Sequence, residues 1–254
     1  MHPLIEQLRG KLIVSCQAYM GEPMRHPETM AQIARAAELG GAAAIRCQGL
    51  SDIAAIKGRV EIPVIGLWKE GHEGVYITPS VRHARACIAA GSDIVAIDAT
   101  GRLRPDGSTF EDTVEAVRGE TLVMADCACM DDVHRAVAAG VDIVSTTMAG
   151  YAPGREKTEG PDLDFVREAV AVAGDTPVFC EARAYAAQAR GRSMPAHSPW
   201  SWEPPSLILR ALRAGSATLC CRADGARVLS VESDKSAAGN CACGGFVYRR
   251  HFLE

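Results

Sequence analysis

Three stretches of this chain repeat one pattern, and a repeat of this kind restricts the possible folds more than any other feature of the sequence. The stretches are ARAAELGGAAAIRCQG (34–49), ARACIAAGSDIVAIDATG (84–101) and HRAVAAGVDIVSTTMAG (134–150). In each, an alanine-rich helical segment ends at glycine, which adopts the left-handed conformation at little cost. A β-branched apolar run and then polar residues follow. The pattern predicts repeated units of a helix and a strand.

Seven apolar runs are predicted to be strands. They are continuously apolar rather than alternating, as expected of parallel strands that are buried on both faces. We predict strands over 12–18, 42–47, 63–69, 93–100, 121–127, 142–148 and 177–181, with helices between them that include 27–39, 80–90, 131–139 and 162–173. This spacing favours an α/β fold, a TIM (β/α)8 barrel, because a closed barrel needs eight strands. A doubly wound open sheet is the alternative, but no G-x-G-x-x-G follows the first strand.

The eighth unit is missing from the written sequence. SMPAHSPWSWEPPSLILR (193–210) stands where that unit is expected. Read one base out of frame, its codons permit DAGALAVVVGTAITHPA, which has the helix end, glycine, apolar strand and polar loop of the other units. We therefore predict that residues 1–181 form barrel units one to seven and that 182–254 is an atypical tail, a frameshifted eighth unit. A genuine divergent tail is the alternative, and no helical or strand period is evident from Cys220 onward.

Length and charge restrict the class of protein. The 254 residues suit one large α/β domain or two small ones, and the net charge of −4 does not favour nucleic acid. No apolar run is long enough to span a bilayer, and the N-terminus lacks the pattern of a secretory signal, so we expect a cytoplasmic protein. Cys16, Cys47, Cys127 and Cys180 lie in or at the end of strand-like runs and are expected to be buried and reduced. Neither CAC pair has zinc-site spacing, and no metal is expected.

Polar residues at the carboxyl ends of the predicted strands are the candidates for a functional site. In a TIM barrel these ends converge on one mouth. The candidates are Gln17, Arg46, Lys69, Asp98, Arg102, Asp126, Thr146, Thr147 and Glu181.

Lys69 and Glu181 are the strongest candidates for chemistry. Lys69 ends the apolar run PVIGLWK, where burying its charge costs free energy. Burial of this kind lowers a lysine pKa and makes the amine available as a base. An ion pair between Lys69 and a barrel carboxylate is the alternative, and Glu181 in PVFCEA is either an acid or a structural ion-pair partner. If Lys69 and Glu181 lie in the same mouth, the two side chains can act as an acid–base pair.

The motifs along the strands also carry a family resemblance. They are KLIVSCQA, AAAIRCQG followed by SDI, PVIGLWK, VYITPS, GSDIVAIDATGRLRP, VMADC, GVDIVSTTMAGY and PVFCEA. Over about its first 181 residues the chain resembles the N-acetylmannosamine-6-phosphate 2-epimerases. The out-of-frame VVVGTAIT resembles the eighth strand and phosphate loop of that family.

The resemblance implies a function and a set of site residues. The family interconverts N-acetylmannosamine 6-phosphate and N-acetylglucosamine 6-phosphate in sialic-acid and amino-sugar catabolism, without a cofactor. It implies that Lys69 moves the proton at C2 and that Glu181 is the catalytic carboxyl group. The residues implied to bind or surround the substrate are Gln17, Arg46, Asp126, Asp98, Arg102 and Thr147. For Tyr76, Thr147 and Tyr151, a role in packing or loop ordering is at least as well supported as direct contact with the substrate. The implied partner is a phosphorylated N-acetylhexosamine, with neither nucleic acid nor membrane, in a homodimer.

Two other functions stay open at this point. One is another phosphate-binding barrel epimerase, of the ribulose-phosphate type, although a strand-end lysine without a metal-binding histidine pair argues against it. The other is a non-catalytic, truncated barrel remnant. TIM barrels commonly hold phosphate with backbone N–H groups after strands seven and eight. Because the tail replaces these loops, we predict unpaired edges on strands one and seven, an unclosed barrel and weak binding of the sugar phosphate.

Overall fold

Eight strands form one closed sheet in the described part of the chain. The structure is a computed structural model that describes residues 2–19, 21–181 and 216–221. Each strand lies beside its sequence neighbours, and the last lies beside the first. The strands are β1 (Leu12–Cys16), β2 (Ala44–Gln48), β3 (Val64–Leu67), β4 (Ile94–Asp98), β5 (Leu122–Asp126), β6 (Ile143–Ser145), β7 (Val178–Glu181) and β8 (Ser216–Cys221). β1 to β7 run parallel, which confirms the predicted α/β barrel.

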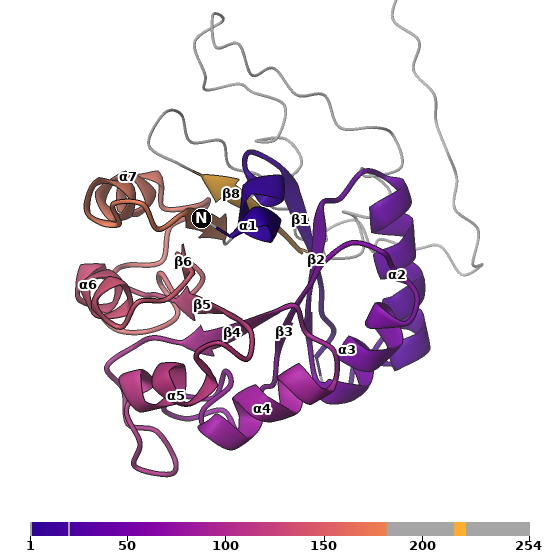
Figure 1. Ribbon diagram of the computed structural model, residues 1–254, viewed down its shortest axis with the longest axis horizontal. Coiled ribbons are helices and arrows are strands. Elements are labelled where there is room, and N and C mark those ends of the chain that lie inside the picture. The colour runs from indigo at the N-terminus through magenta and orange to yellow at the C-terminus, as the bar shows by residue number, and fades with distance from the viewer. Residues whose placement is uncertain (1, 20, 182–215, 222–254) are drawn as a thin grey trace, which may run out of the picture.

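One helix, α1 (Pro3–Leu8), covers the end of the barrel at which the strands begin, and the others surround the sheet on its outside (Figure 1). These are α2 (Pro27–Leu39), α3 (Leu50–Lys57), α4 (Val81–Ala89), α5 (Phe110–Val117), α6 (Met130–Ala138) and α7 (Leu163–Val172). The α2 bounds are as predicted, and α4, α6 and α7 differ from the prediction by one residue at each end. Gly91 and Gly140, which follow α4 and α6, have φ of 104° and 72°, so glycine ends these helices as the repeat predicts.

Alternate strand residues serve two separate cores. Ile13, Ile65 and Phe179 point into the barrel and belong to the inner core, which Ile5 and Leu8 of α1 also join. Their sequence neighbours on the strands face the surrounding helices in a second, larger core that includes Val14, Ile45, Val64, Val95 and Val144. This division follows from the period of two along a strand. It explains why the strands are apolar throughout instead of alternating.

The predicted strands are longer than the observed ones, mostly at their carboxyl ends. The third strand was expected over 63–69, whereas β3 ends at Leu67 and Lys69 forms an isolated antiparallel bridge with Ile77. The run of apolar residues marks burial, and burial continues beyond the ladder into the loops. The polar side chains of the candidate site therefore lie at the last strand residues or just past them.

β8 corrects the prediction that the first and seventh strands have unpaired edges and that the barrel is not closed. Ser216–Cys221 pairs with both edges, with Ser216 opposite Ser15 and Cys221 opposite Val178. It runs antiparallel to both, whereas the eighth strand of a regular barrel is parallel. Backbone N–H and C=O groups pair in either direction, so an apolar segment within reach is sufficient to satisfy both edges. The strand includes Cys220, where no strand period had been recognised.

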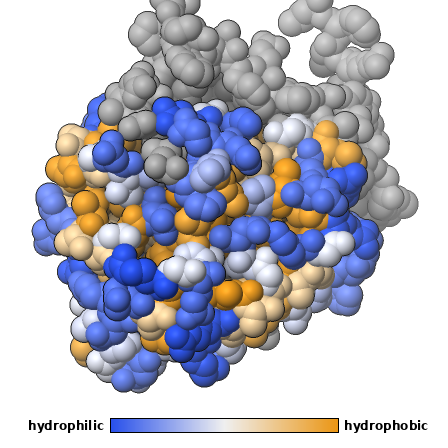
Figure 2. Space-filling model, in the orientation of Figure 1, coloured by the Kyte–Doolittle hydropathy of each residue, from blue (hydrophilic) through white to orange (hydrophobic). Residues whose placement is uncertain are grey.

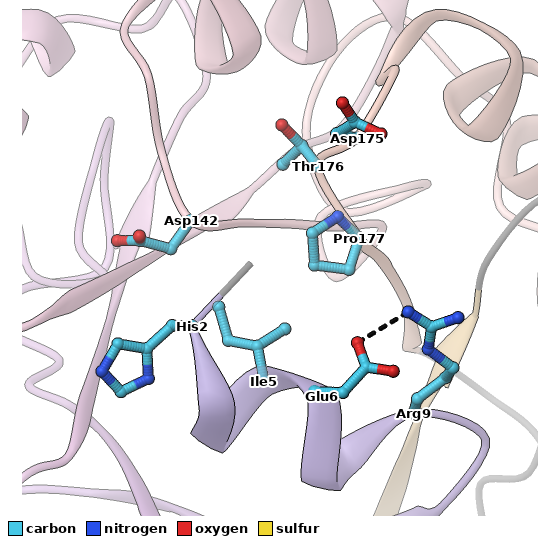
Figure 3. A pocket seen from close by; sticks show the side chains of 8 residues that line it. All are labelled: His2, Ile5, Glu6, Arg9, Asp142, Asp175, Thr176 and Pro177. Atoms are coloured by element: carbon cyan, nitrogen blue, oxygen red, sulfur yellow. Dashed lines mark hydrogen bonds and ion pairs between the residues drawn. The ribbon is translucent and has the colours of Figure 1, made fainter.

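The end of the barrel at which the strands begin holds a hollow of about 470 Å³ (Figure 3). α1 lines it with Glu6 and Arg9, whose ion pair measures 2.6 Å, and Asp142 and Pro177 line it where β6 and β7 begin. This hollow lies at the opposite end from the candidate residues. In TIM barrels this end usually contributes to stability, whereas the active site lies at the opposite end.

The surface shows hydrophilic and hydrophobic residues interspersed over the face seen in Figure 2. Within the described residues, no helix is long and apolar enough to cross a membrane. Cys16, Cys47, Cys127 and Cys180 are buried, as expected.

Candidate active site

The carboxyl ends of β2, β5 and β7 bring Arg46, Asp126 and Glu181 together. Arg46 is 1% exposed and forms a fork with Asp126, with Nη1 3.1 Å from Oδ1 and Nη2 2.6 Å from Oδ2. Nη1 of Arg46 also lies 2.9 Å from Oε2 of Glu181. One buried cation thus neutralises two carboxyl groups, and such a bidentate geometry is rigid as well as strong. Despite these contacts, Nε of Arg46 is buried and has no hydrogen-bond partner among the described residues.

Thr147 joins the same cluster from the loop after β6. Its Oγ1 lies 3.0 Å from Oδ1 of Asp126, 2.7 Å from Oε2 of Glu181 and 2.7 Å from Oγ of Ser145. A hydroxyl group has one proton to donate, and ionised carboxylates only accept. The Thr147 hydroxyl group therefore donates its one proton to Glu181 or Asp126, or shares it between them.

Glu181 is the carboxyl group whose environment favours the protonated form. Burial raises its pKa, and the nearby charge of Asp126 raises it further, while Arg46, the Thr147 hydrogen bond and Lys69 oppose the shift. Its backbone is fixed by Thr146, whose Oγ1 donates to the Glu181 carbonyl at 3.1 Å.

Lys69 faces this cluster from the loop after β3. Its Nζ donates to Oε1 of Gln17 at 3.0 Å, and Gln17 in turn donates to Oγ of Ser15 at 2.8 Å. Burial lowers the pKa of Lys69 to about 8, and the positive charge of Arg46 lowers it as well, against the opposing effects of Glu181 and Asp126. The neutral fraction of the amine near neutral pH is therefore small but far larger than that of an exposed lysine, as a general base requires.

Asp98 and Arg102 form a second polar group beside the first. Asp98 is fully buried at the end of β4, opposite Asp126 in the ladder, and Oδ2 accepts from Nη2 of Arg102 at 2.6 Å. Its other oxygen accepts from Thr100, and burial raises its pKa. The Arg102 guanidinium lies over the Tyr76 ring, 5.7 Å from the centroid. These contacts hold Asp98, Arg102 and Tyr76 in fixed positions at one side of the mouth.

Some residues near the site carried no recognisable signal in the sequence. The Nζ of Lys69 lies 5.2 Å from the centre of the Tyr19 ring, and Tyr19 is 67% exposed. Arg25 donates to the carbonyl of Ala18 at 3.2 Å, and its charge acts on Lys69. Both lie in the loop after β1, where neither period nor motif indicates which side chains turn inward. Tyr151 is half exposed and has the Lys157 amine over its ring, and it acts electrostatically on Tyr76.

The loops that were expected to hold a phosphate, after β7 and after β8, lie outside the described residues. The described mouth therefore consists of the acid–base cluster, the Asp98 group and the loops after β1, β3, β4 and β6. A lysine of lowered pKa facing a carboxyl group of raised pKa is an arrangement that moves protons. Its chemistry is suited to a carbon acid next to a carbonyl group.

Comparisons with known proteins give one consistent result. A family model described as "Putative N-acetylmannosamine-6-phosphate epimerase" matches residues 30–194. A Cutibacterium acnes protein named "Putative N-acetylmannosamine-6-phosphate 2-epimerase" is 52% identical over 194 residues, which cover 75% of this chain and 85% of the relative. A protein of the same name from Corynebacterium glutamicum is 50% identical over 184 residues, covering 71% of this chain and 79% of the relative.

A solved structure agrees with these relatives. The N-acetylmannosamine-6-phosphate 2-epimerase from Clostridium perfringens superimposes with a TM-score of 0.69 at 33% sequence identity. The superposition covers 84% of this chain and 86% of that one.

Proposed function

The chain belongs to the N-acetylmannosamine-6-phosphate 2-epimerase family, and from that premise we propose that it is an isomerase of N-acetylhexosamine 6-phosphates. The proposed reaction interconverts N-acetylmannosamine 6-phosphate and N-acetylglucosamine 6-phosphate, in the breakdown of sialic acids and amino sugars. The observation that carries the proposal is the meeting of Lys69 and Glu181 at one mouth, with the Lys69 pKa lowered and the Glu181 pKa raised.

The proposed chemistry is a proton transfer at C2 of the open-chain sugar. The C2 hydrogen becomes acidic only next to the C1 carbonyl group, so the ring opens first. Neutral Lys69 then removes the C2 proton, a C1–C2 double bond forms, and negative charge develops on O1. Protonated Glu181 assists ring opening or stabilises this charge by donating to O1. A solvent-derived proton then reaches the opposite face of C2 and inverts the centre, Glu181 takes its proton back from O1 as the carbonyl group re-forms, and Lys69 releases its proton to solvent.

The other site residues are proposed to orient the reacting groups. Arg46 already contacts two carboxyl groups, so its proposed role is to hold Asp126 and Glu181 toward the substrate. Gln17 fixes the Lys69 amine, and Thr147 links the two carboxyl groups. Asp98 and Arg102 are proposed to shape the wall next to the sugar.

The tail bears on how well the chain holds the phosphate. The family model matches through residue 194 and stops within the SMPAHSPWSWEPP stretch, which supports a frameshift that begins near residue 194, later than the boundary predicted at 182. We propose that the chain keeps its acid–base cluster but binds the phosphate weakly, which raises KM. Sequencing the coding DNA between codons 177 and 210 tests the origin of the tail. A cytoplasmic location and a homodimer stay predictions, and light scattering of the purified chain checks the dimer.

Deuterium incorporation tests the proposed reaction directly. We expect N-acetylmannosamine 6-phosphate, incubated with the chain in heavy water, to give N-acetylglucosamine 6-phosphate that carries deuterium at C2, as followed by proton NMR. Lys69→Met should slow this exchange about 100-fold or more, since a general base contributes on the order of 10²–10⁴ in rate. Lys57→Met is the matched control, because Lys57 pairs with Asp93 on the surface. Unchanged exchange in Lys69→Met would disprove the assignment of the base.

A further inference from the structure

We propose that His83 is a positioning residue, which holds the two residues on either side of Lys69 and so fixes the direction of the Lys69 side chain. His83 lies in the first turn of α4, outside the barrel, and does not touch the acid–base cluster in any contact the structure shows. The inference rests on the proposed function, because it concerns the residue proposed as the base. It adds a role for a helix that the mechanism does not otherwise use.

The side chains around Lys69 point in alternate directions. Successive residues of an extended segment face opposite sides, so Lys69 points into the mouth while Trp68 and Glu70 point toward α4. His83 contacts both of these flanking residues. Its ring centre lies 4.5 Å from that of Trp68, and its Nε2 lies 2.8 Å from Oε2 of Glu70. Arg82 contacts the same two residues from the solvent side, at 4.9 Å from the Trp68 ring and 2.8 Å from Oε2 of Glu70.

The orientation of the His83 ring is fixed at both nitrogens. Nδ1 lies 2.7 Å from Oγ of Ser80, which precedes α4, and the His83 side chain is buried. Nε2 lies 2.8 Å from Oε2 of Glu70 and 3.1 Å from Nη2 of Arg82. Contacts at both ring nitrogens set the direction in which the ring faces Trp68 and Glu70.

The backbone of the same three residues is held by the returning chain. The N–H of Thr78 donates to the Trp68 carbonyl at 2.8 Å, its Oγ1 accepts from the Trp68 N–H at 3.2 Å, and the Glu70 N–H donates to the Tyr76 carbonyl at 3.0 Å. Thr78 has φ of 46°, a left-handed conformation that a β-branched residue adopts rarely. Such strain persists only where the surroundings enforce it, and it concentrates at functional sites. The backbone clamp and His83 therefore act on one short segment, which carries Lys69.

Exact placement matters for a base on a long, flexible side chain. Lys69 reaches its partner Gln17 only from the position that the segment imposes. A displacement of about 1 Å at a reacting group costs on the order of 10² in rate. Without His83, we expect the segment to relax outward and Lys69 to leave its buried position.

Two measurements on variants test the role of His83. In His83→Phe, which keeps a ring and loses both hydrogen bonds, we expect kcat to fall about 10- to 100-fold with KM changed less than about twofold. We also expect the pH midpoint of Lys69 labelling, by reductive methylation and peptide mass spectrometry, to rise toward that of an exposed lysine. His83→Gln, which keeps a donor near the position of Nε2, should recover part of both. His134→Phe, on the exposed face of α6, should match the unmodified chain.

The labelling keeps this proposal separate from the proposed function. If the unmodified chain turns over no sugar phosphate, the proposed function fails, while the labelling midpoints still decide the role of His83. An unmoved Lys69 midpoint in a folded His83→Phe variant would overturn the inference even if the chain is active. If His83→Phe does not fold, Glu70→Leu removes the same hydrogen bond at a half-exposed residue, and the same outcomes apply to it.

Discussion

At the scale of single residues, Arg46 illustrates how a site can depend on one buried charge. Its guanidinium contacts Asp126 and Glu181 within the barrel, and these contacts and charges raise its own pKa, although burial opposes the shift. A buried ion pair contributes little compared with an apolar replacement of both partners, but removing one partner leaves an uncompensated charge. The main energetic effect of Arg46 is therefore that it compensates the buried charges of Asp126 and Glu181, which would otherwise destabilise the fold.

Arg46→Leu should destabilise the chain strongly. We expect the free energy of unfolding to fall by about 3–5 kcal/mol, since Asp126 and Glu181 lose their buried cation. Urea unfolding at neutral pH measures this loss. Arg85→Leu is the control, because the exposed Arg85–Glu120 pair is worth at most about 1 kcal/mol. If the free energy of unfolding fell equally in the two variants, the buried Arg46 cluster would stabilise the chain no more than a surface ion pair does.

The sequence indicated the residues that end strands but not those that loops bring to them. Lys69, Glu181, Arg46 and Asp126 were predictable because the barrel directs every strand end to one mouth. Lys69 itself lies past β3, so even this success depended on the loop that follows. Tyr19 reaches Lys69 through the path of an irregular loop, and no local pattern specifies such a path. Their catalytic and binding roles stay predictions.

At the scale of elements, the repeat predicted the bounds of α2, α4, α6 and α7 to within one residue, because each of these helices carries its own stop signal. α5 adds a start signal, a reciprocal cap in which Oγ1 of Thr109 accepts from the Asp112 N–H at 3.0 Å and the Asp112 carboxylate accepts from the Thr109 N–H at 2.8 Å. The direction of β8 was not predictable in this way. A strand's direction depends on the connection that delivers it, and the repeat ends before that connection.

Leu219→Pro should open the barrel at β8. Leu219 lies opposite Leu12 of β1 and Cys180 of β7, and proline removes a backbone N–H from the middle of a three-stranded ladder. The freed edges should then promote self-association. Size-exclusion chromatography with light scattering is the measurement, with Leu219→Val as the control that keeps the N–H. A monodisperse Leu219→Pro variant with an unchanged melting temperature would contradict the observed pairing.

At the scale of the whole molecule, the buried amine of Lys69 connects the site to global stability. Folding lowers its pKa from 10.5 to about 8, so between these pH values the unfolded chain holds more protons at this residue. The free energy of unfolding therefore contains a contribution that rises with pH across this window. Below about pH 8, the amine is charged in both states and its buried charge costs stability in full.

Lys69→Met should reveal this cost. We expect the variant to be more stable than the unmodified chain at about pH 7, with the difference shrinking toward about pH 10, because methionine has no charge to bury. Urea unfolding of both proteins at the two pH values gives the difference, in which the contributions of other titrating groups cancel. A difference that does not depend on pH would mean that the Lys69 pKa is not lowered by folding.

The reversed direction of β8 has a consequence for how many sequences can complete this sheet. Ladder hydrogen bonds join backbone groups, so they place little demand on the identity of the residues that complete the ring. A last strand that departs from the repeat, and runs against its neighbours, still pairs with both β1 and β7. The closing position of the ring is therefore more tolerant of sequence change than the strand ends that carry Arg46, Asp126 and Glu181.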